Sequence, residues 1–137
     1  MKTDFSNGFT TKQKVAILVI LGCLSEIDHV RSDEEMNQLI QIASLLDVDL
    51  ESPLIENLLN EVGRLPYKDC MGILSELNKT QKEWIIVCAV SIAAADGEIV
   101  QSEENAISNF CEHFGISNNE FGNIIKKMSA LQGKVQN

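Results

Sequence analysis

The sequence predicts an all-α fold of about seven helices, in which two three-helix repeats surround a pair of buried central helices. Three observations predict this class. Apolar residues recur three and four positions apart along most of the chain, which is the helical period. Only two prolines occur, and the eight glycines lie mostly at segment ends, so long helices are favoured over many short strands. The two halves of the chain also align with each other at a nearly constant offset.

The first half of the chain is expected to contain four helices. The first runs from Thr11 to about Ile27 and is apolar on nearly every face, so other elements must surround it. Ser32 and Glu35 form a capping box that opens the second helix. Ser52-Pro53 starts the third, which ends before Pro66, and a short fourth helix is expected within residues 67–77. The inward positions of the second and third helices are Met36, Leu39, Ile42, Ala43 and Leu46, then Ile55, Leu58, Leu59 and Val62.

The second half is expected to contain three helices. A capping box at Thr80–Glu83 launches a second wholly apolar helix, which Trp84 heads as a core residue. Ser102 can start the next helix, with Gly115 just past its end, and a capping box at Ser117–Glu120 begins the last one. The inward positions of these last two helices are Ala106, Ile107, Phe110, Cys111 and Phe114, then Phe121, Ile124, Ile125, Met128 and Leu131.

The repeat spans about residues 12–64 and 80–132. Asp28 and Asp96 lie 68 positions apart, as do Glu35 and Glu103, and the apolar positions of the first two helices in each unit match at the same offset. Neither unit could bury its apolar first helix alone, so the two central helices should pack together. We expect them to be antiparallel, which would place the two acidic turns at opposite ends of the molecule.

The length and composition predict a single domain over residues 1–137 with a substantial core. Residues 1–10 and 133–137 are expected to fray, with Phe5 or Phe9 docking on the core. The longest apolar runs, residues 15–24 and 85–95, are shorter than the roughly 20 residues that a membrane span needs, so no direct membrane insertion is expected.

The charge balance restricts the class of partner. The chain has 20 acidic and 11 basic residues, a net charge of −9. Such a chain repels phosphate backbones and anionic lipid surfaces, so nucleic acid is excluded as an expected partner. Cations and basic protein surfaces are the natural counterparts.

The cysteines indicate a reducing cytoplasm. Cys23, Cys70, Cys88 and Cys111 are widely spaced and form no C-x-x-C pair. Three of them, all except Cys70, lie within apolar helical patterns, where a thiol behaves as a small hydrophobic group. No apolar signal core precedes Val15, which also favours a cytoplasmic location.

The acidic turn after each central helix is the candidate site. Asp96-Gly97-Glu98 followed by Glu103 is similar to the later part of an EF-hand loop, but Ile92 and Ala94 stand at the earlier ligand positions. Calcium takes 6–8 oxygen ligands, so an EF-hand is excluded.

Two interpretations of these carboxylates remain open. In the first they cap helices, because an acid near a helix N-terminus is favourable without any ion. In the second the crowded acids share a weakly bound divalent cation, because like charges repel unless solvent or a cation separates them. The ligands would be Asp96, Glu98 and Glu103, and by the repeat Asp28 and Glu35.

The motif A-A-D-G-E-I at residues 94–99, followed by Glu103 and an amphipathic helix ending in F-G-I-S at residues 114–117, resembles the TerB-like family. The family includes tellurite-resistance protein TerB and the N-terminal region of some membrane-anchored J-domain co-chaperones. The resemblance covers residues 12–132 and is sharpest at Ala93–Glu104. It implies an all-helical fold of two pseudo-symmetric halves, a cytoplasmic location, and a role in stress response or in assembly with protein partners near the inner membrane.

The resemblance also implies site residues. The family's acidic positions, proposed to bind metal, fall on Asp96 and Glu103, and by the internal repeat on Asp28 and Glu35. The chain departs from the family pattern in its first half, where His29 replaces the turn glycine. In the second half Val100 stands where the first has the capping Ser32. The second turn is the better candidate.

No catalytic arrangement is recognisable. Cys111 and His113 lie two apart on a helix and hence on different faces, and the chain has no phosphate loop, H-E-x-x-H motif or nucleophile triad. We therefore expect a non-enzymatic acidic interaction module with a protein partner, tuned by a divalent cation. The alternative is a structural adaptor that binds a basic or apolar protein surface without any ion. The sequence leaves the oligomeric state open.

Overall fold

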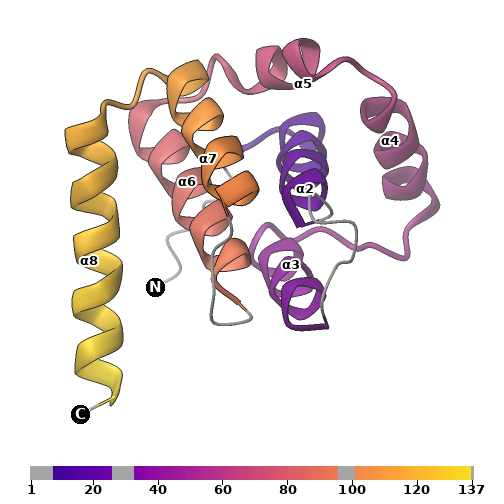
Figure 1. The fold of residues 1–137 in the computed structure, drawn as a ribbon. Coiled ribbons are helices and arrows are strands. Elements are labelled where there is room, and N and C mark those ends of the chain that lie inside the picture. Colours follow the sequence, from indigo (N-terminus) through magenta and orange to yellow (C-terminus); the bar gives the residue numbers. More distant parts are fainter. Residues whose placement is uncertain (1–7, 26–32, 96–100, 137) are drawn as a thin grey trace.

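The computed structural model describes residues 8–25, 33–95 and 101–136, with side chains described up to residue 127 in the last helix. In this part of the chain all regular structure is helical, which confirms the predicted fold class. The helices, shown in Figure 1, are α2 (Thr11–Ser25), α3 (Asp33–Leu45), α4 (Pro53–Gly63), α5 (Tyr67–Leu74), α6 (Lys79–Ala93), α7 (Gln101–Phe114) and α8 (Asn118–Gln136).

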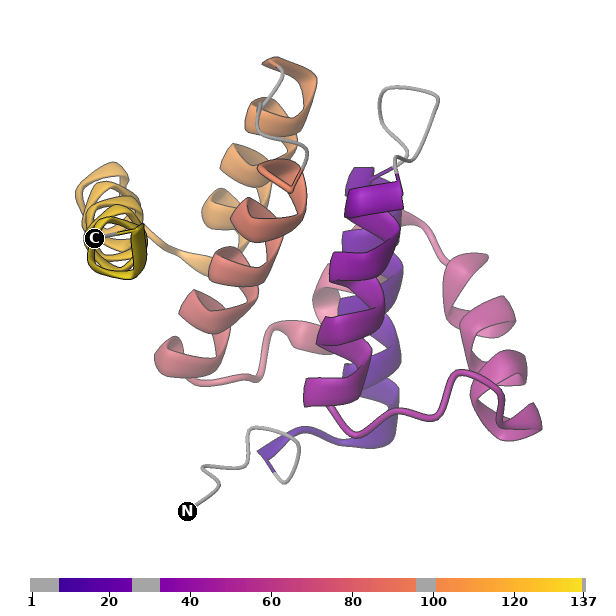
Figure 2. The same ribbon diagram turned by 90° about the horizontal axis from the view of Figure 1, so that it is seen from below.

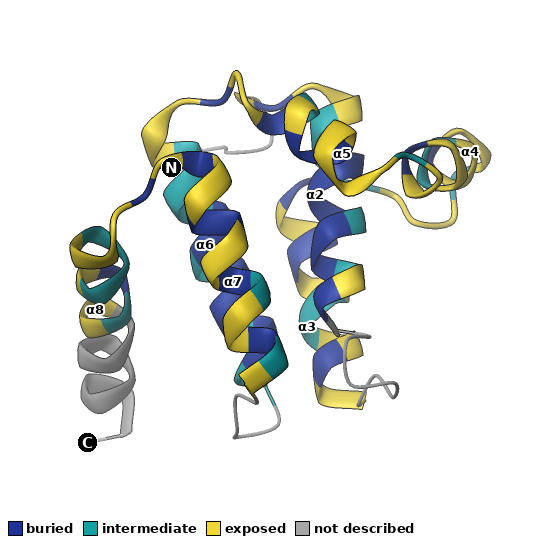
Figure 3. Cartoon of the chain, turned by 45° about the horizontal axis from the view of Figure 1, so that its top comes forward, coloured by how far each residue is buried: buried dark blue, intermediate teal, exposed yellow. Residues whose placement is uncertain are grey.

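Helix α2 is the most enclosed element of the fold. It packs against α3, α4, α5, α6 and α7, and Figure 3 shows its buried surface between them. Val15, Ala16, Ile17 and Leu21 are fully buried. These residues point in different directions around the helix, so burying all of them requires neighbours on several sides. The absence of a polar face in the sequence is therefore what places α2 at the centre.

Helix α6 is the second central helix, and a polar group ties it to α3. Ile85, Ile86, Ala89 and Ile92 are fully buried. The polar residue that interrupts its apolar run, Ser91, donates a hydrogen bond from Oγ to the Cys88 carbonyl at 2.8 Å and accepts one from Gln38 Nε2 at 3.1 Å. A part-buried hydroxyl needs such partners.

Helices α2 and α6 run in the same direction, so the expected antiparallel pairing was wrong. Both start at one end of the molecule and finish at the other, as Figures 2 and 3 show. The first turns of α3 and α7 consequently lie at that same far end (Figure 2). Hydrophobic packing has no preferred direction, and the path through α3, α4 and α5 returns the chain to the end where α2 began.

The outer helices of the two halves make matching contacts. Helices α3 and α4 pack on α2, whereas α7 and α8 pack on α6. In addition α3 contacts α6, and α7 contacts α2. This exchange of contacts is what a duplicated unit would produce, and the repeat itself stays a prediction.

Two of the predicted helix starts hold, and a third is shifted. Ser117 N–H donates to Glu120 Oε1 at 3.0 Å and Glu120 N–H donates to Ser117 Oγ at 3.1 Å, which is the predicted capping box of α8. Pro53 is the first residue of α4, as predicted. The box of α6, however, is formed by Asn78 and Gln81 and not by Thr80–Glu83, because α6 begins at Lys79.

Helices α3 and α7 end in the same way. Asp47 has a φ of 58° and Gly115 a φ of 71°, both in the left-handed region. The next residues donate backward over five positions, Val48 N–H to the Ala43 carbonyl and Ile116 N–H to the Cys111 carbonyl, each at 2.9 Å. These are Schellman ends. The predicted role of Gly115 is confirmed, and Asp47 adopts the same conformation without being glycine.

Phe9 docks on the core, one of the two contacts expected of the N-terminal segment. Phe9 is buried against Trp84, with ring centroids 5.9 Å apart, and Gln81 Nε2 donates to the Gly8 carbonyl at 2.8 Å. Phe5 lies outside the described residues. Helix α8 extends to Gln136, and the fraying expected of residues 133–137 stays a prediction.

Candidate functional site: an acidic end and an apolar groove

The predicted site residues Glu35 and Glu103 are the buried charged side chains of the described structure, with exposed fractions of 5% and 3%. Each is the third residue of its helix, α3 and α7 respectively. An acid at this position interacts favourably with the helix N-terminus. Helices α3 and α7 begin at the same end of the molecule (Figure 2), so both residues belong to first turns at that end.

The other predicted ligands lie outside the described residues. These are Asp28, Asp96 and Glu98, and the capping residue Ser32 and the turn residue His29 fall there too. Within residues 8–25, 33–95 and 101–136, no three or more His, Cys, Asp or Glu side chains are grouped as metal ligands. The predicted cation site therefore stays a prediction. The structure adds that two of its predicted ligands, Glu35 and Glu103, are buried.

An apolar groove lies between α2, α3 and α4. We call this groove, together with the hollow that continues it, the α3 groove. Its first part has a volume of about 290 Å³ and its second about 490 Å³. The two parts share Ile40, Ala43 and Leu50. The remaining lining residues of the first part are Leu18, Val19, Gly22, Cys23, Met36, Leu39 and Leu59.

One edge of the α3 groove is acidic. The second part is lined by Asp47, Asp49 and Glu51 beside Ile40 and Leu50, with Ser44 and Val48 completing it. These three carboxylates occupy the connection from α3 to α4 and are exposed. Asp49 Oδ1 accepts the Glu51 N–H at 3.0 Å, which fixes the turn that presents them. The groove thus combines an apolar floor with a negative edge.

Helical periodicity predicted the buried face of α3 but missed this groove. Ile40 and Leu50 are 47% and 40% exposed, and Met36, predicted to point inward, is 37% exposed. The missed signal was a second apolar stripe, since Met36 and Ile40 lie one turn apart beside the inner face. Leu50 stands in a connecting segment, where no period could assign it.

The cysteines divide into one exposed and three buried residues. Burial raises the pKa of Cys88 to about 12 and that of Cys111 to about 11. Burial, followed by the nearby Cys23 and Asp69, also raises the pKa of Cys70. Cys23 is exposed, although it lies within the apolar pattern of α2. It lies on the side of α2 that borders the α3 groove.

This all-α architecture, with two central helices and acidic helix starts at one end, is the class of fold that the sequence motif predicted. Comparison with protein families matches residues 14–126 to the family described as Tellurite resistance protein TerB. The match spans most of the 137 residues, and the chain belongs to this family. The resemblance predicted from residues 12–132 is confirmed.

Comparisons with curated proteins and with solved structures gave no match. Among the described helices none has both the length and the apolar character needed to cross a membrane.

Proposed function

We propose that the chain is an interaction module whose α3 groove binds a basic, amphipathic segment of a partner protein. The observation that carries the proposal is the combination of exposed Ile40 and Leu50 with the carboxylates of Asp47, Asp49 and Glu51 in one groove. Surface apolar residues that cluster in a groove are typical of binding sites. The proposed role is binding, not catalysis.

The charges of the groove select the partner's chemistry. The three carboxylates at the edge attract Lys and Arg, and the net charge of −9 repels acidic segments. A segment that places apolar residues along one face and basic residues beside them would fill the floor and pair with the edge. In the family's stress-response setting, this segment would belong to a protein partner in the cytoplasm or at the inner membrane.

A model peptide tests the groove directly. The probe is a fluorescein-labelled helix of leucine and lysine, about five turns long, compared with the same helix in which glutamate replaces lysine. We expect the basic peptide to bind, with the double variant Ile40→Ser, Leu50→Ser weakening it by about tenfold or more. Leu54→Ser is the matched control, because Leu54 is 63% exposed but lines neither part of the groove.

Charge variants test the acidic edge. Asp47→Asn with Asp49→Asn should weaken the basic peptide and reduce the salt dependence of binding. The turn should survive the second change, because an amide oxygen at position 49 can still accept the Glu51 N–H. Equal affinity for the wild type and the groove variants would contradict the proposal. Proteins from the host that the wild type retains and the Ile40→Ser, Leu50→Ser variant loses are the candidate partners.

A divalent cation at the acidic end is the second candidate function. What favours it is the burial of Glu35 and Glu103 at one end of the molecule, in the helices that follow the two acidic turns. The predicted ligands Asp96 and Glu98, and Asp28 in the first turn, would complete the site.

Calorimetry and thermal denaturation separate this function from helix capping. Titration with Ca²⁺, Mg²⁺, Mn²⁺ and Zn²⁺ should release or absorb heat at millimolar ion or below. The variant Asp96→Asn, Glu103→Gln should then lose stability only when the ion is present. A loss of the same size without any ion would assign both residues to capping alone.

A further inference from the structure

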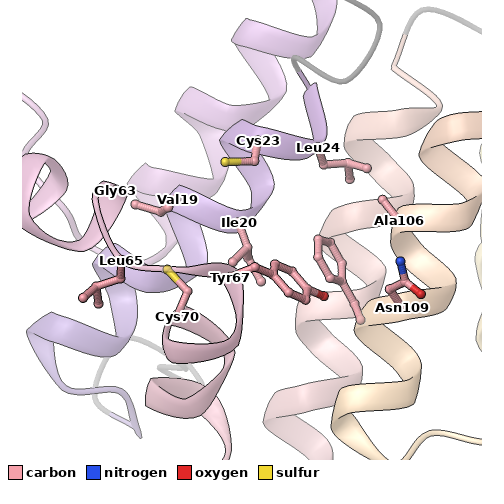
Figure 4. A pocket seen from close by; sticks show the side chains of 11 residues that line it. Val19, Ile20, Cys23, Leu24, Gly63, Leu65, Tyr67, Cys70, Ala106 and Asn109 are labelled. Atoms are coloured by element: carbon pink, nitrogen blue, oxygen red, sulfur yellow. The ribbon is translucent and has the colours of Figure 1, made fainter.

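A second cavity lies on another side of α2, between α2, α5 and α7. Its volume is about 400 Å³, within the range of about 300–1,000 Å³ that is usual for small-molecule sites. Figure 4 shows the side chains from these helices that line it, together with Leu65 from the connection between α4 and α5. The lining residues are Val19, Ile20, Cys23, Leu24, Gly63, Leu65, Tyr67, Cys70, Ala106, Asn109 and Phe110. We call it the α5 pocket.

None of the described residues that line the α5 pocket is charged. Its polar groups, besides the two thiols, are the Tyr67 hydroxyl from α5 and the Asn109 amide from α7, and in Figure 4 the hydroxyl points toward α7. Neither the hydroxyl nor the amide has a hydrogen bond to another part of the described structure. An apolar cavity with a few polar groups at one side is the usual design of a small-molecule site.

Aromatic contacts hold Tyr67 in place. Its ring stacks on Phe110 at a centroid distance of 6.2 Å and meets His113 edge-on at 5.2 Å. Burial raises the pKa of Tyr67, and the negative charge of Glu112 raises it further. The hydroxyl is therefore a neutral hydrogen-bonding group at pH 7, and Glu112 beside it disfavours an anionic ligand.

We propose that the α5 pocket binds a compact, neutral apolar molecule with one hydrogen-bonding group, held by Tyr67 and Asn109. This goes beyond binding a protein segment in the α3 groove. The apolar body would contact Val19, Ile20 and Phe110, and the polar group would meet the hydroxyl and the amide. The absence of charge among the described lining residues and the acidity of the chain select against anions.

A pair of fluorescent probes that differ only in charge tests the proposal. N-phenyl-1-naphthylamine is neutral and carries one N–H, and 1-anilinonaphthalene-8-sulfonate is the same molecule with an added anion. We expect saturable binding of the neutral probe with one site per chain. The affinity for the sulfonate should be lower by at least about tenfold. No saturable binding of the neutral probe, or equal affinity for both, would overturn the proposal.

Filling variants locate the probe. Ala106→Phe places an aromatic ring in the α5 pocket. Asn109→Trp places one there from the exposed rim, and it serves as the test if Ala106→Phe does not fold. Each should weaken the neutral probe by about tenfold or more. Ser108→Phe is the matched control on α7, because Ser108 is exposed and does not line the pocket. Unchanged affinity in a folded filling variant would refute the assignment.

The exposed thiol gives an independent readout. Cys23 lines the α5 pocket, whereas the other three cysteines are buried, so N-ethylmaleimide should modify Cys23 first. The neutral probe should slow this modification in the wild type and not in Ala106→Phe. Cys23 also borders the α3 groove, but Ala106 does not. Slowing that persists in Ala106→Phe would place the probe in the groove and overturn the α5 assignment.

Discussion

Asp47 after α3 and Gly115 after α7 adopt the same left-handed backbone conformation, but only one of them is glycine. For a residue with a Cβ this conformation costs roughly 1–2 kcal/mol, and aspartate tolerates it better than most. Asp47 also stands at the acidic edge of the α3 groove. Its side chain is therefore useful to the proposed interaction at a position where glycine would be more stable.

Substitutions at these two positions should have opposite effects on the free energy of unfolding. Asp47→Gly should raise the free energy of unfolding by up to about 1 kcal/mol, and Gly115→Ala should lower it by about 1 kcal/mol, because only glycine takes a φ of this kind without strain. Urea denaturation measures both.

Gly63→Ala is the control for this pair. Gly63 lies in the last turn of α4, and a Cβ there would meet nothing within 4 Å. It should be neutral or mildly stabilising. A loss of stability as large as that of Gly115→Ala would contradict the backbone explanation.

At the scale of the element, the start of α6 shows that Asn78, and not Thr80, caps the helix. Asn78 Oδ1 accepts the Gln81 N–H at 2.8 Å, and Gln81 Oε1 accepts the Asn78 N–H at 3.0 Å. Thr80 lies inside the first turn instead. The capping box predicted from the sequence has Thr80 as its cap and leaves Asn78 out, although asparagine and threonine are both favoured N-cap residues. The position of the preceding chain decides between them.

Alanine substitution tests this assignment. Asn78→Ala should cost about 1 kcal/mol of unfolding free energy, because it leaves a helix N–H without its partner. Thr80→Ala should change stability by a few tenths of a kcal/mol at most. Thermal or urea denaturation of the two variants compares them directly, and a larger effect at Thr80 would support the box predicted from the sequence.

Helix α8 is held at its first turn by an ion pair. Lys79 at the start of α6 pairs with Glu120, and Ser117 hydrogen bonds to the same carboxylate. Together they lower the pKa of Glu120 to about 2, with Lys79 as the larger cause. The pair links the two helices at the point where the chain enters α8.

This pair predicts how stability depends on pH. Because the folded-state pKa of Glu120 is below its usual value of 4.5, its stabilisation is present above that value and is lost as pH falls toward 2. The stability difference between the wild type and Glu120→Gln should therefore shrink between about pH 5 and pH 2. Urea titrations across that range measure it.

Glu61→Gln on α4 serves as the control, because Glu61 is exposed and has no ion pair in the described structure. Its stability difference from the wild type should stay nearly flat over the same range. If the stability difference changes with pH in the same way for both variants, the ion pair of Glu120 is not the cause.

At the scale of the whole molecule, one core joins the two halves. The two central helices contact each other, and α3 and α7 each contact the central helix of the other half. Such packing couples the halves, so the chain should unfold in a single cooperative transition. Trp84 on α6 reports on the second half, whereas far-UV circular dichroism reports on all helices.

A core substitution in α2 tests this coupling. Leu21→Ala should cost about 2–5 kcal/mol, because Leu21 is fully buried, while Leu54→Ala at an exposed site should cost far less. The Trp84 fluorescence and circular dichroism transitions should shift together although Leu21 and Trp84 belong to different halves. A shift of the dichroism alone would show that the halves unfold separately.

The candidate site was predictable in part. The acids that start α3 and α7 were recognisable because helix starts depend on local residue type, and Glu35 and Glu103 occupy these starts. Their burial was not predictable, because it depends on which helices cover each first turn. The α3 groove and the α5 pocket were missed for the same reason, since each is formed by side chains from at least three separate helices.

The sequence by itself determined the order and type of the described helices, the central place of α2 and α6, and the family. These follow from local periodicity, capping residues and the absence of a polar face, all of which act within one segment or its immediate neighbours. Only the tertiary structure decided that the central helices are parallel, that Cys23 and Met36 face outward, and that Asn78 caps α6. Hydrophobic burial sets which faces are covered but not the direction in which covering helices run, so the connections between helices decide the rest.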